Sequence, residues 1–164
     1  MTTIHQAQTR QVHFHEPAAP EATAVAPSVE VAVRWLGGRL LMVRRCDDGM
    51  WELPGGFVAV GESAVDAAVR TTAAGAGIHV LVTGIAGLFT DPAIVVRSPD
   101  GQLRQRFALL FRARPLGGVP HGDHRATSDA AWVAVADLPQ LAVAPSARRP
   151  IVEALALGEP TYLG

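Results

Sequence analysis

The glycine-rich segment between Trp51 and Ile78 constrains the fold of this chain more than any other feature. It reads WELPGGFVAVGESAVDAAVRTTAAGAGI over residues 51–78. Pro54 and the two glycines after it interrupt an extended stretch, because proline lacks a backbone donor and glycine adopts conformations that other residues avoid. A helical pattern follows from about residue 63. The segment therefore predicts a loop, a helix and a second loop.

Residues 63–74 are predicted to form the helix, with apolar positions on one face. Those positions recur at helical spacing: Val65, Ala68, Val69, Thr72 and Ala76. Ser63 is the expected N-cap, because its hydroxyl accepts a hydrogen bond from a free backbone N–H of the first turn. Gly75 and Gly77 are expected to end the helix. The face predicted to point away from the core carries Ala67, Thr71, Ala74 and Gly75.

Patterns on both sides of this segment predict strands. In residues 28–35, valine and tryptophan alternate with polar or small residues, as in a half-buried strand. Gly37-Gly38 then leads into residues 39–45, so the two stretches are expected to form a hairpin. Further strands are predicted at four places: 79–89, 94–97, 103–113 and 132–135. The remaining elements predicted are a loop at 117–129 and a closing helix at 146–157.

Length and composition fit one domain. The chain has 164 residues, of which 49% are hydrophobic, and this is enough for a sizeable core. Strands mixed with two helices predict an α/β sandwich. The domain is predicted over residues 28–164. A flexible arm rich in alanine and proline is predicted before it, over residues 1–27, with one short extended piece near residues 11–15.

The balance of charge excludes some partners. The net charge is −1, and all 14 basic residues are arginine. Neither property favours binding to nucleic acid or to an anionic membrane surface. No apolar run reaches the length of about 18 residues needed to span a bilayer. Cys46 is the only cysteine, so no intramolecular disulfide can form and a cytoplasmic location is expected.

The order of residues in 51–78 resembles the Nudix box of the Nudix hydrolase family. In that pattern a glycine precedes a glutamate, and an arginine-glutamate pair is followed by two further glutamates, a glycine and a hydrophobic residue. The positions in register are Gly56, Glu62, Arg70, Gly77 and Ile78. The likeness extends over about residues 28–157, from the strand before the Trp-x-Leu-Pro-Gly-Gly entry to the closing helix. It implies the Nudix fold, a mixed β-sheet sandwiched between helices.

The resemblance also implies hydrolysis of a nucleoside diphosphate linked to another group. In that chemistry Mg²⁺ or Mn²⁺, held by oxygen ligands, activates water and stabilises charge on the transferred phosphoryl group. The family glutamates that would hold the metal fall at Thr71, Ala74 and Gly75, which supply no carboxylate. Glu62 remains as the expected metal ligand, and Glu62 and Arg70 are the predicted catalytic residues.

Arg70 has an alternative, structural role. Asp66 and Arg70 lie four residues apart, a spacing that favours an ion pair on a helix. Arg70 is therefore interpreted as a scaffold residue paired with either Glu62 or Asp66. Ligand-binding residues are expected beside the box: Arg44, Arg45, Gly55 and Gly56. For the two glycines, the alternative is a role in backbone shape alone.

Three other groups of polar residues each allow two interpretations. Arginines that alternate along one predicted strand either bind phosphate or form a solvated face: Arg104, Arg106, Arg112 and Arg114. Residues of the late loop either supply a metal ligand or further catalytic acid, or are simply polar: His121, Asp123, His124 and Asp129. Histidines of the arm are either metal ligands or solvated: His5, His13 and His15.

Two functions from different classes follow from the sequence. The first is a pseudoenzyme with a degenerate Nudix box, which binds a nucleotide-like small molecule or a protein partner and has weak or no activity. The alternative is a divergent active hydrolase of the ADP-ribose or nucleotide-sugar pyrophosphatase type. It would use Mg²⁺ or Mn²⁺ with Glu62 and acids outside the box, such as Glu52. A homodimer is also expected, supported by the apolar first hairpin.

Overall fold

The computed structural model describes residues 9–156, 158 and 160–164. Its strands are β1 Gln11–Phe14, β2 Ala24–Val33, β3 Leu40–Arg45, β4 Trp51–Glu52, β5 Gly55–Phe57, β6 Ile78–Phe89, β7 Ile94–Arg97, β8 Leu103–Gly118, β9 Thr127–Val133 and β10 Tyr162–Leu163. Its α-helices are α1 Ala64–Ala76 and α2 Arg148–Leu155, and its 3₁₀ turns are η1 Leu36–Gly38, η2 Val135–Gln140 and η3 Pro145–Ala147.

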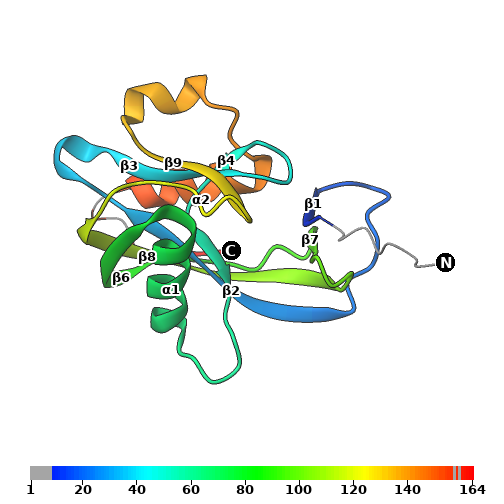
Figure 1. Ribbon diagram of the computed structural model, residues 1–164. Helices are drawn as coiled ribbons and strands as arrows, with labels where there is room; N and C mark the ends of the chain where they lie inside the picture. The colour runs from blue at the N-terminus through cyan, green and yellow to red at the C-terminus, as the bar shows by residue number, and fades with distance from the viewer. Residues whose placement is uncertain (1–8, 157, 159) are drawn as a thin grey trace.

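The strands form two sheets (Figure 1). In the larger sheet the order is β1-β7-β8-β2-β5, and β6 pairs with both β8 and β10. In the smaller sheet the order is β4-β3-β9, and in Figure 1 this sheet lies above the larger one. The pairing of β2 with β8 is parallel and runs from Ala24 opposite Arg104 to Val33 opposite Ala113. The mixed larger sheet, the antiparallel smaller sheet and the two helices confirm the predicted α/β class.

The predicted first hairpin is wrong. Strand β2 pairs with β5 and β8, whereas β3 pairs with β4 and β9, so the two stretches belong to different sheets. Only an isolated bridge between Arg34 and Leu40 joins them. Gly37 and Gly38 both have positive φ, 77° and 78°, a conformation that glycine adopts without strain. This turn sends the chain from one sheet into the other instead of folding it back.

Helix α1 has the predicted start and a later end than predicted. The Ser63 side chain accepts from the backbone N–H of Asp66, and the Asp66 side chain accepts from the backbone N–H of Ser63, a complete capping box. The helix runs through Gly75 to Ala76. It stops at Gly77, whose φ of 71° is left-handed. A Cβ on Gly77 would also collide with the ring of His121.

The faces of α1 also differ from the prediction. Ala67 and Thr71, assigned to the outward face, are 0% and 8% exposed, whereas Val65, assigned to the core, is 46% exposed. The reason is that α1 contacts strands of both sheets, among them β6, β5 and β9. A helix packed on two sides buries a wider arc than a helix on one sheet.

Three other predicted boundaries shift. Strand β8 continues to Gly118, and β9 begins at Thr127 rather than at 132, because Thr127 already pairs with Arg45 of β3. The late loop is therefore shortened to residues 119–126. The closing helix begins at Arg148, after the 3₁₀ turn that Pro145 opens. None of the helices in the described residues has the length and hydropathy needed to cross a membrane.

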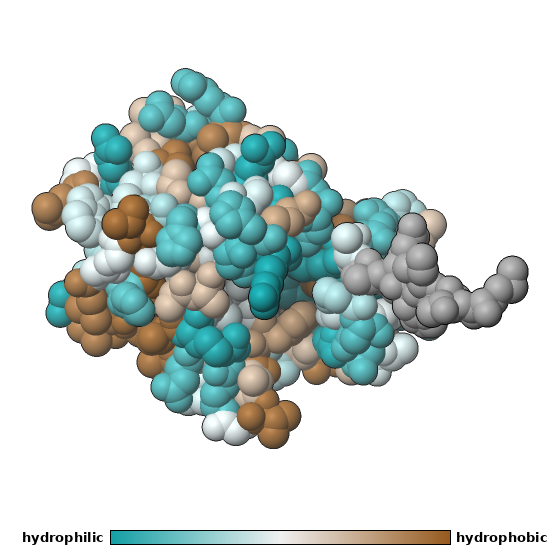
Figure 2. Space-filling model, viewed as in Figure 1, coloured by the Kyte–Doolittle hydropathy of each residue, from teal (hydrophilic) through white to brown (hydrophobic). Residues whose placement is uncertain are grey.

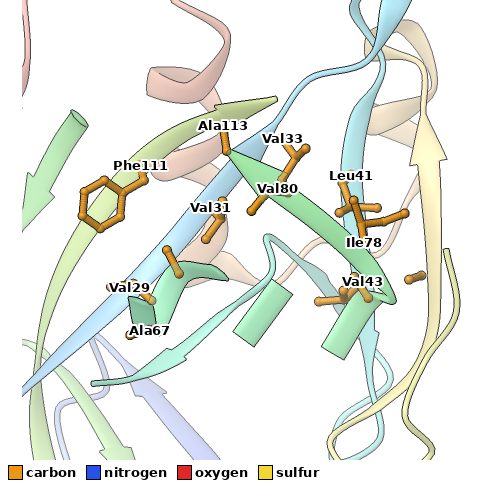
Figure 3. Close-up of a cluster of buried hydrophobic side chains, with 13 residues drawn as sticks. Val29, Val31, Val33, Leu41, Val43, Ala67, Ile78, Val80, Phe111 and Ala113 are labelled. Carbon is orange, nitrogen blue, oxygen red and sulfur yellow. The ribbon is translucent and has the colours of Figure 1, made fainter. Parts of the chain in front are cut away.

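The core consists mainly of valine, leucine and alanine, in two clusters on either side of the larger sheet. Figure 3 shows how side chains of β2, β3, α1, β6 and β8 meet in the first cluster. The labelled residues are Val29, Val31 and Val33 of β2, Leu41 and Val43 of β3, Ala67 of α1, Ile78 and Val80 of β6, and Phe111 and Ala113 of β8. The second cluster contains Leu40 and Met42 of β3 together with Ile151 of α2. Strand β3 therefore buries both of its faces.

The predicted arm contains ordered structure in its described part. Strand β1 pairs with β7 from Gln11 opposite Arg97 to Phe14 opposite Ile94, and β2 begins at Ala24. In Figure 1, β1 and β7 form an extension at the side of the molecule. Residue 5, with its histidine, lies outside the described residues.

The two described histidines of the arm have separate carboxylate partners. His13 Nδ1 lies 2.7 Å from Glu16 Oε2, and His15 Nε2 lies 2.7 Å from Asp91 Oδ2. His13 is only 7% exposed, so the interpretation as a solvated side chain does not hold for it. Neither interaction assembles a metal site.

Removing the cap of α1 is expected to destabilise the fold. Ser63→Ala deletes the side-chain acceptor of the N-cap and should lower the free energy of unfolding by about 1 kcal/mol. Ser63→Asn keeps an acceptor at this position and should lose less than half as much. Urea denaturation, with an unchanged m value, measures both differences. Equal losses in the two variants would contradict the assigned capping role.

Candidate functional site

A cavity of about 340 Å³ lies where α1, the strands β2, β3, β4 and β5, and the late loop meet. Its wall includes residues from segments far apart in sequence, from Arg10 of the arm to Thr127 of β9. Hydrophilic side chains dominate the middle of the molecular face shown in Figure 2. The cavity contains most of the predicted site residues, so it is the candidate functional site.

The cavity side of α1 carries the positions where the family resemblance places metal ligands. Thr71, Ala74 and Gly75 all line the cavity. The Thr71 hydroxyl donates to the backbone oxygen of Ala67 at 2.8 Å, one turn earlier, so it is already engaged. Within the described residues, no group of three or more His, Cys, Asp or Glu side chains is placed to hold a metal ion.

Glu62 and Arg70 form a two-point ion pair beside the cavity. Arg70 Nε donates to Glu62 Oε2 at 3.0 Å and Arg70 Nη2 to Glu62 Oε1 at 2.5 Å. Arg70 Nη2 also donates to the carbonyl of Phe57 at 3.0 Å, which links α1 to β5. The hydrogen bonds from Arg70, followed by that from the backbone of Ala59, lower the pKa of Glu62 to about 2. Asp66 takes no part in this pair because it completes the capping box.

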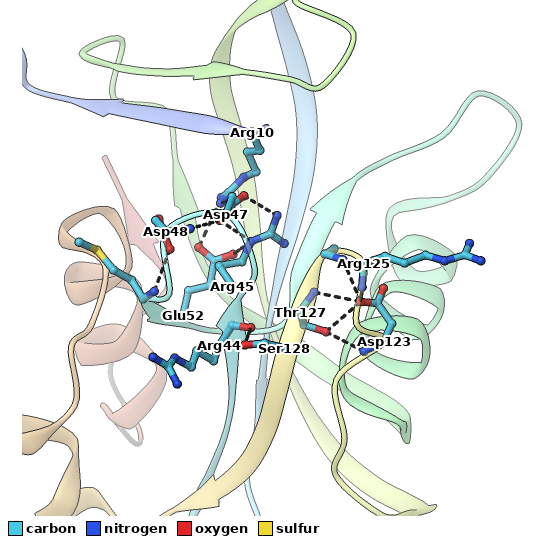
Figure 4. A network of polar contacts seen from close by, with 12 residues as sticks. Arg10, Arg44, Arg45, Asp47, Asp48, Glu52, Asp123, Arg125, Thr127 and Ser128 are labelled. Atoms are coloured by element: carbon cyan, nitrogen blue, oxygen red, sulfur yellow. Dashed lines mark hydrogen bonds and ion pairs between the residues drawn. The ribbon is translucent and has the colours of Figure 1, made fainter. Parts of the chain in front are cut away.

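A second cluster of charges lies on the opposite wall and includes Arg45, one of the predicted ligand contacts (Figure 4). Arg45 Nη2 lies 2.9 Å from Asp47 Oδ2, and Arg45 Nε lies 3.6 Å from Glu52 Oε1. Arg10 reaches the same two carboxylates from the arm, at 3.8 Å from Asp47 and 3.4 Å from Glu52. Desolvation lowers the pKa of Arg45, but its hydrogen bond to Asp47 and the charge of Glu52 outweigh this and raise it. Both carboxylates are therefore balanced by guanidinium groups.

Arg44 does not belong to this wall. Its side chain is exposed, and its Nε donates to the carbonyl of Gly49 at 3.0 Å. The next residue, Arg45, points to the cavity because successive side chains of a strand alternate in direction. The prediction named both arginines, and only Arg45 lines the cavity.

Gly55 and Gly56 line the cavity and also meet tight steric limits. A Cβ on Gly55 would collide with the carbonyl oxygen of Val29, because β5 pairs closely with β2 here. A Cβ on Gly56 would lie 3.0 Å from Thr71 Cγ2. Both positions therefore favour glycine for steric reasons, whether or not these residues also contact a ligand.

A third pair was not anticipated as a unit. Arg106 Nη2 of β8 lies 2.9 Å from Glu30 Oε1 of β2, and both side chains line the cavity. Burial raises the pKa of Glu30, although the charge of Arg106 opposes this. In the sequence, Glu30 occupies a polar position of an alternating strand, and Arg106 belongs to the stripe of four arginines. Strand alternation assigns both to an outward face, but the parallel β2–β8 pairing places them in the cavity wall.

The other arginines of that stripe have structural partners. Arg104 Nη2 of β8 lies 2.9 Å from Oδ2 of Asp100 in the β7–β8 turn. Arg112 donates to the carbonyls of Ile85 and Ala156. Arg114 is exposed. The stripe is therefore neither one phosphate site nor one solvated face.

The late loop is organised around Asp123. Its Oδ1 accepts from the backbone N–H groups of Arg125, Ala126 and Thr127, each at 2.8 or 2.9 Å. Desolvation raises the pKa of Asp123, but these backbone hydrogen bonds outweigh it and lower the pKa. The Thr127 hydroxyl donates to the carbonyl of Gly75 at 2.7 Å and fastens the loop to the end of α1. Asp123 is thus a structural acceptor.

The remaining polar residues of this region are not brought together. His121 Nδ1 lies 2.9 Å from the carbonyl of Val119. Asp129 Oδ1 accepts from the backbone N–H of Ala130 at 2.8 Å. His124 is exposed and has a φ of 59°. They form no metal site with Asp123.

Comparison with known sequences gives consistent relatives. The model of the NUDIX domain matches residues 24–155. A MutT-like protein of Streptomyces ambofaciens is 34% identical over 91 residues, which are 56% of this chain and 53% of that protein. The match therefore spans about half the length of that relative. A Bacillus subtilis (strain 168) protein described as a candidate 8-oxo-dGTP diphosphatase is 33% identical over 113 residues, 69% of this chain and 68% of that protein.

Solved structures share the fold. An ADP-ribose pyrophosphatase from Streptococcus suis 89-1591 superposes with a TM-score of 0.68 at 19% identity, covering 85% of this chain and 98% of that chain. A NUDIX hydrolase from Nitrosomonas europaea gives a TM-score of 0.71 at 20% identity, covering 88% and 80%. At these identities the likeness concerns the fold alone.

The contribution of the Glu62–Arg70 pair is expected to depend on pH. Glu62 has a pKa of about 2 in the folded protein, against 4.5 as the ordinary value. A carboxyl with a lowered folded pKa stabilises the fold above its unfolded pKa and loses that contribution as pH falls through the folded value. The difference in free energy of unfolding between wild type and Glu62→Gln should therefore stay constant near neutral pH and shrink from pH 4.5 down to about 2.

Urea denaturation at a series of pH values measures this difference. In an Arg70→Gln background the pH dependence of the Glu62→Gln difference should become smaller, because Arg70 is the main cause of the lowered pKa. The same pH dependence with and without Arg70 would contradict the assignment.

Proposed function

The chain belongs to the NUDIX domain family, and from this premise we propose that it is a catalytically impaired member. It binds a nucleoside diphosphate derivative or a related small molecule and hydrolyses it weakly or not at all. The observation that carries the proposal is the cavity side of α1, where Thr71, Ala74 and Gly75 stand. In terms of the family pattern, this is a degenerate Nudix box.

The physical reason is the chemistry of divalent cations. Mg²⁺ and Mn²⁺ prefer carboxylate oxygens, and a metal-assisted hydrolysis uses the ion to activate water and neutralise developing charge. Phosphoryl transfer depends mainly on positioning and electrostatics, so weak retention of the ion removes most of the rate. A methyl group, a hydrogen atom and one hydroxyl already bonded to Ala67 do not replace three carboxylates.

The acids that remain near the cavity do not fit a metal centre. Glu62 is paired with Arg70, and Glu52 lies between Arg10 and Arg45. Asp123 accepts three backbone hydrogen bonds. Each of these three carboxylates would have to give up its partner to bind an ion, and Glu30, which also lines the cavity, is paired with Arg106. No hydrolytic step is therefore assigned to a metal in this protein.

A second candidate is a divergent active hydrolase of the ADP-ribose or nucleotide-sugar pyrophosphatase type. The candidate 8-oxo-dGTP diphosphatase name of the Bacillus relative favours hydrolysis. Such an enzyme would use Mg²⁺ or Mn²⁺ with Glu62 and acids outside the box, such as Glu52, which lines the cavity. In this case Glu62 and Arg70 are catalytic, and Arg45 with Gly55 and Gly56 contacts the ligand.

Several wider expectations belong to the same proposal. The partner is a small molecule, and neither nucleic acid nor membrane is expected.

A homodimer is proposed through a different surface from the one predicted, because Leu40–Val43 are buried in the core. Exposed hydrophobic side chains gather instead over β6 and β8, at the lower left of Figure 2. Cys46 is exposed and unpaired in the described structure, consistent with a cytoplasmic location.

A turnover assay separates the two candidates. The pure protein is incubated with Mg²⁺ or Mn²⁺ and a panel of nucleoside diphosphate sugars, dinucleoside polyphosphates and nucleoside triphosphates. The expected result is no turnover above that of the Glu62→Gln variant. Metal-dependent turnover that falls at least about tenfold in Glu62→Gln would overturn the impaired assignment in favour of the hydrolase.

Restoring carboxylates to α1 tests the proposed cause. Ala74 is exposed, and a Cβ on Gly75 would meet Thr127 Cγ2 at an ordinary 3.7 Å, so Ala74→Glu/Gly75→Glu fits the fold. This variant should bind Mn²⁺ at least about tenfold more tightly than wild type, because paired carboxylates are hard oxygen ligands. Isothermal titration calorimetry measures the affinity, with Ala74→Gln/Gly75→Gln as the uncharged control.

Equal Mn²⁺ affinity in wild type, the glutamate variant and the glutamine control would show that these positions do not limit metal binding. Adding Thr71→Glu completes the family pattern. Because Thr71 is 8% exposed, this third change is checked first for an unchanged melting temperature.

A further inference from the structure

The pair formed by Glu30 and Arg106 differs from the other charged groups of the cavity because it has unused hydrogen-bonding capacity. Within the described residues, four buried side-chain atoms make no hydrogen bond, and two of them are Glu30 Oε2 and Arg106 Nη2. Buried polar atoms in folded proteins are nearly always satisfied by protein or water. Arg106 Nη2 is ion-paired with Glu30 Oε1, so what points to a missing partner is the second N–H of that nitrogen together with the free acceptor Glu30 Oε2.

The position of the pair is held from several sides. Arg106 Nη1 donates to the carbonyl of Ser146 at 3.2 Å, which anchors the guanidinium to a residue outside the cavity lining. Arg106 Nη2 remains 2.9 Å from Glu30 Oε1. The two side chains are only 11% and 17% exposed, for Arg106 and Glu30, and they stand on neighbouring strands. The donor and the acceptor are thus preorganised.

The other charged groups of the cavity offer no comparable site. Arg45 and Arg10 share the carboxylates of Asp47 and Glu52. Arg70 is used by Glu62 and by a backbone carbonyl. With these charges compensated, the part of the cavity beside Glu30 and Arg106 favours an uncharged polar group of the ligand.

We propose that Glu30 and Arg106 recognise the edge of an uncharged heterocyclic base. Glu30 Oε2 accepts from an N–H of that edge, and Arg106 Nη2 donates to the adjacent ring nitrogen or carbonyl. This rests on the proposed function, which assigns a nucleotide-like ligand to the same cavity, and it names the residues that determine specificity. A volume of about 340 Å³ suits a ligand of that size. The recognition needs no metal ion.

Binding of nucleosides in the presence of EDTA tests the inference. Guanosine, adenosine, uridine and cytidine are titrated into the full chain and followed by calorimetry. Glu30→Gln keeps an oxygen for Arg106 but replaces the unused acceptor by an NH₂ donor. It should weaken the best-bound nucleoside at least about tenfold, as expected for loss of one member of a paired base contact. The form of that nucleoside methylated on the edge N–H should bind wild type correspondingly weakly.

Two further variants keep the test independent of folding. Arg106→Lys retains a positive charge beside Glu30 but loses the planar guanidinium, and it should also weaken binding at least about tenfold. Arg114→Gln is the matched control, because Arg114 is an exposed arginine on the same strand outside the cavity, and it should leave binding unchanged. Melting temperatures show that each variant is folded. If Glu30→Gln does not fold, Arg106→Lys decides the outcome.

The inference is overturned if no nucleoside binds wild type at millimolar concentration, or if wild type and the folded variants bind equally. Equal binding would mean that water alone satisfies the pair. Failure of the proposed function looks different, since it appears as metal-dependent turnover. In that event a raised KM with unchanged kcat in Glu30→Gln would still support base recognition by this pair.

Discussion

The close packing of α1 between the two sheets is the constraint on which the rest of the structure depends. It is possible because the buried positions of the helix are small: Ala67, Ala68, Thr72 and Ala76 are 0% exposed. Glycines at 55 and 56 let β5 approach both β2 and the helix. This packing sets the cavity against one side of α1, and it fixes Arg70 where it joins the helix to Glu62 and Phe57.

Compensation of charge is the second organising feature. Arginines from four segments reach the cavity and each meets a carboxylate, which for Arg10 and Arg106 comes from a distant part of the chain. Guanidinium groups suit such sites because the N–H donors of this planar group can form two parallel hydrogen bonds to one carboxylate. The result is a polar cavity with little free charge. Such a cavity agrees better with ligand binding than with an open cluster of metal-binding acids.

Local patterns allowed much of the fold to be predicted. Ser63 caps the start of α1 as predicted, and the predicted turn at residues 98–101 joins β7 to β8. The predicted pairing of Arg70 with an acid of the box segment is present, and its partner is Glu62. The hairpin prediction failed because β3 buries both faces, so no alternation distinguished its true partners. Glu30 and Arg106 were not predicted as a pair, since they are 76 residues apart and meet only through the parallel β2–β8 register.

The sequence by itself determined a capped helix with glycines before and after it. It also determined that Thr71, Ala74 and Gly75 of this helix supply no carboxylate. These follow from backbone preferences and side-chain chemistry, which are properties of neighbouring residues. The tertiary structure decided which charges neutralise one another and which remain available. Only the assembled sheets place Arg10 beside Glu52, turn Asp123 into a backbone acceptor, and leave Glu30 and Arg106 with unused hydrogen-bonding atoms. Pairing across long sequence separations depends on strand register, which no local pattern encodes.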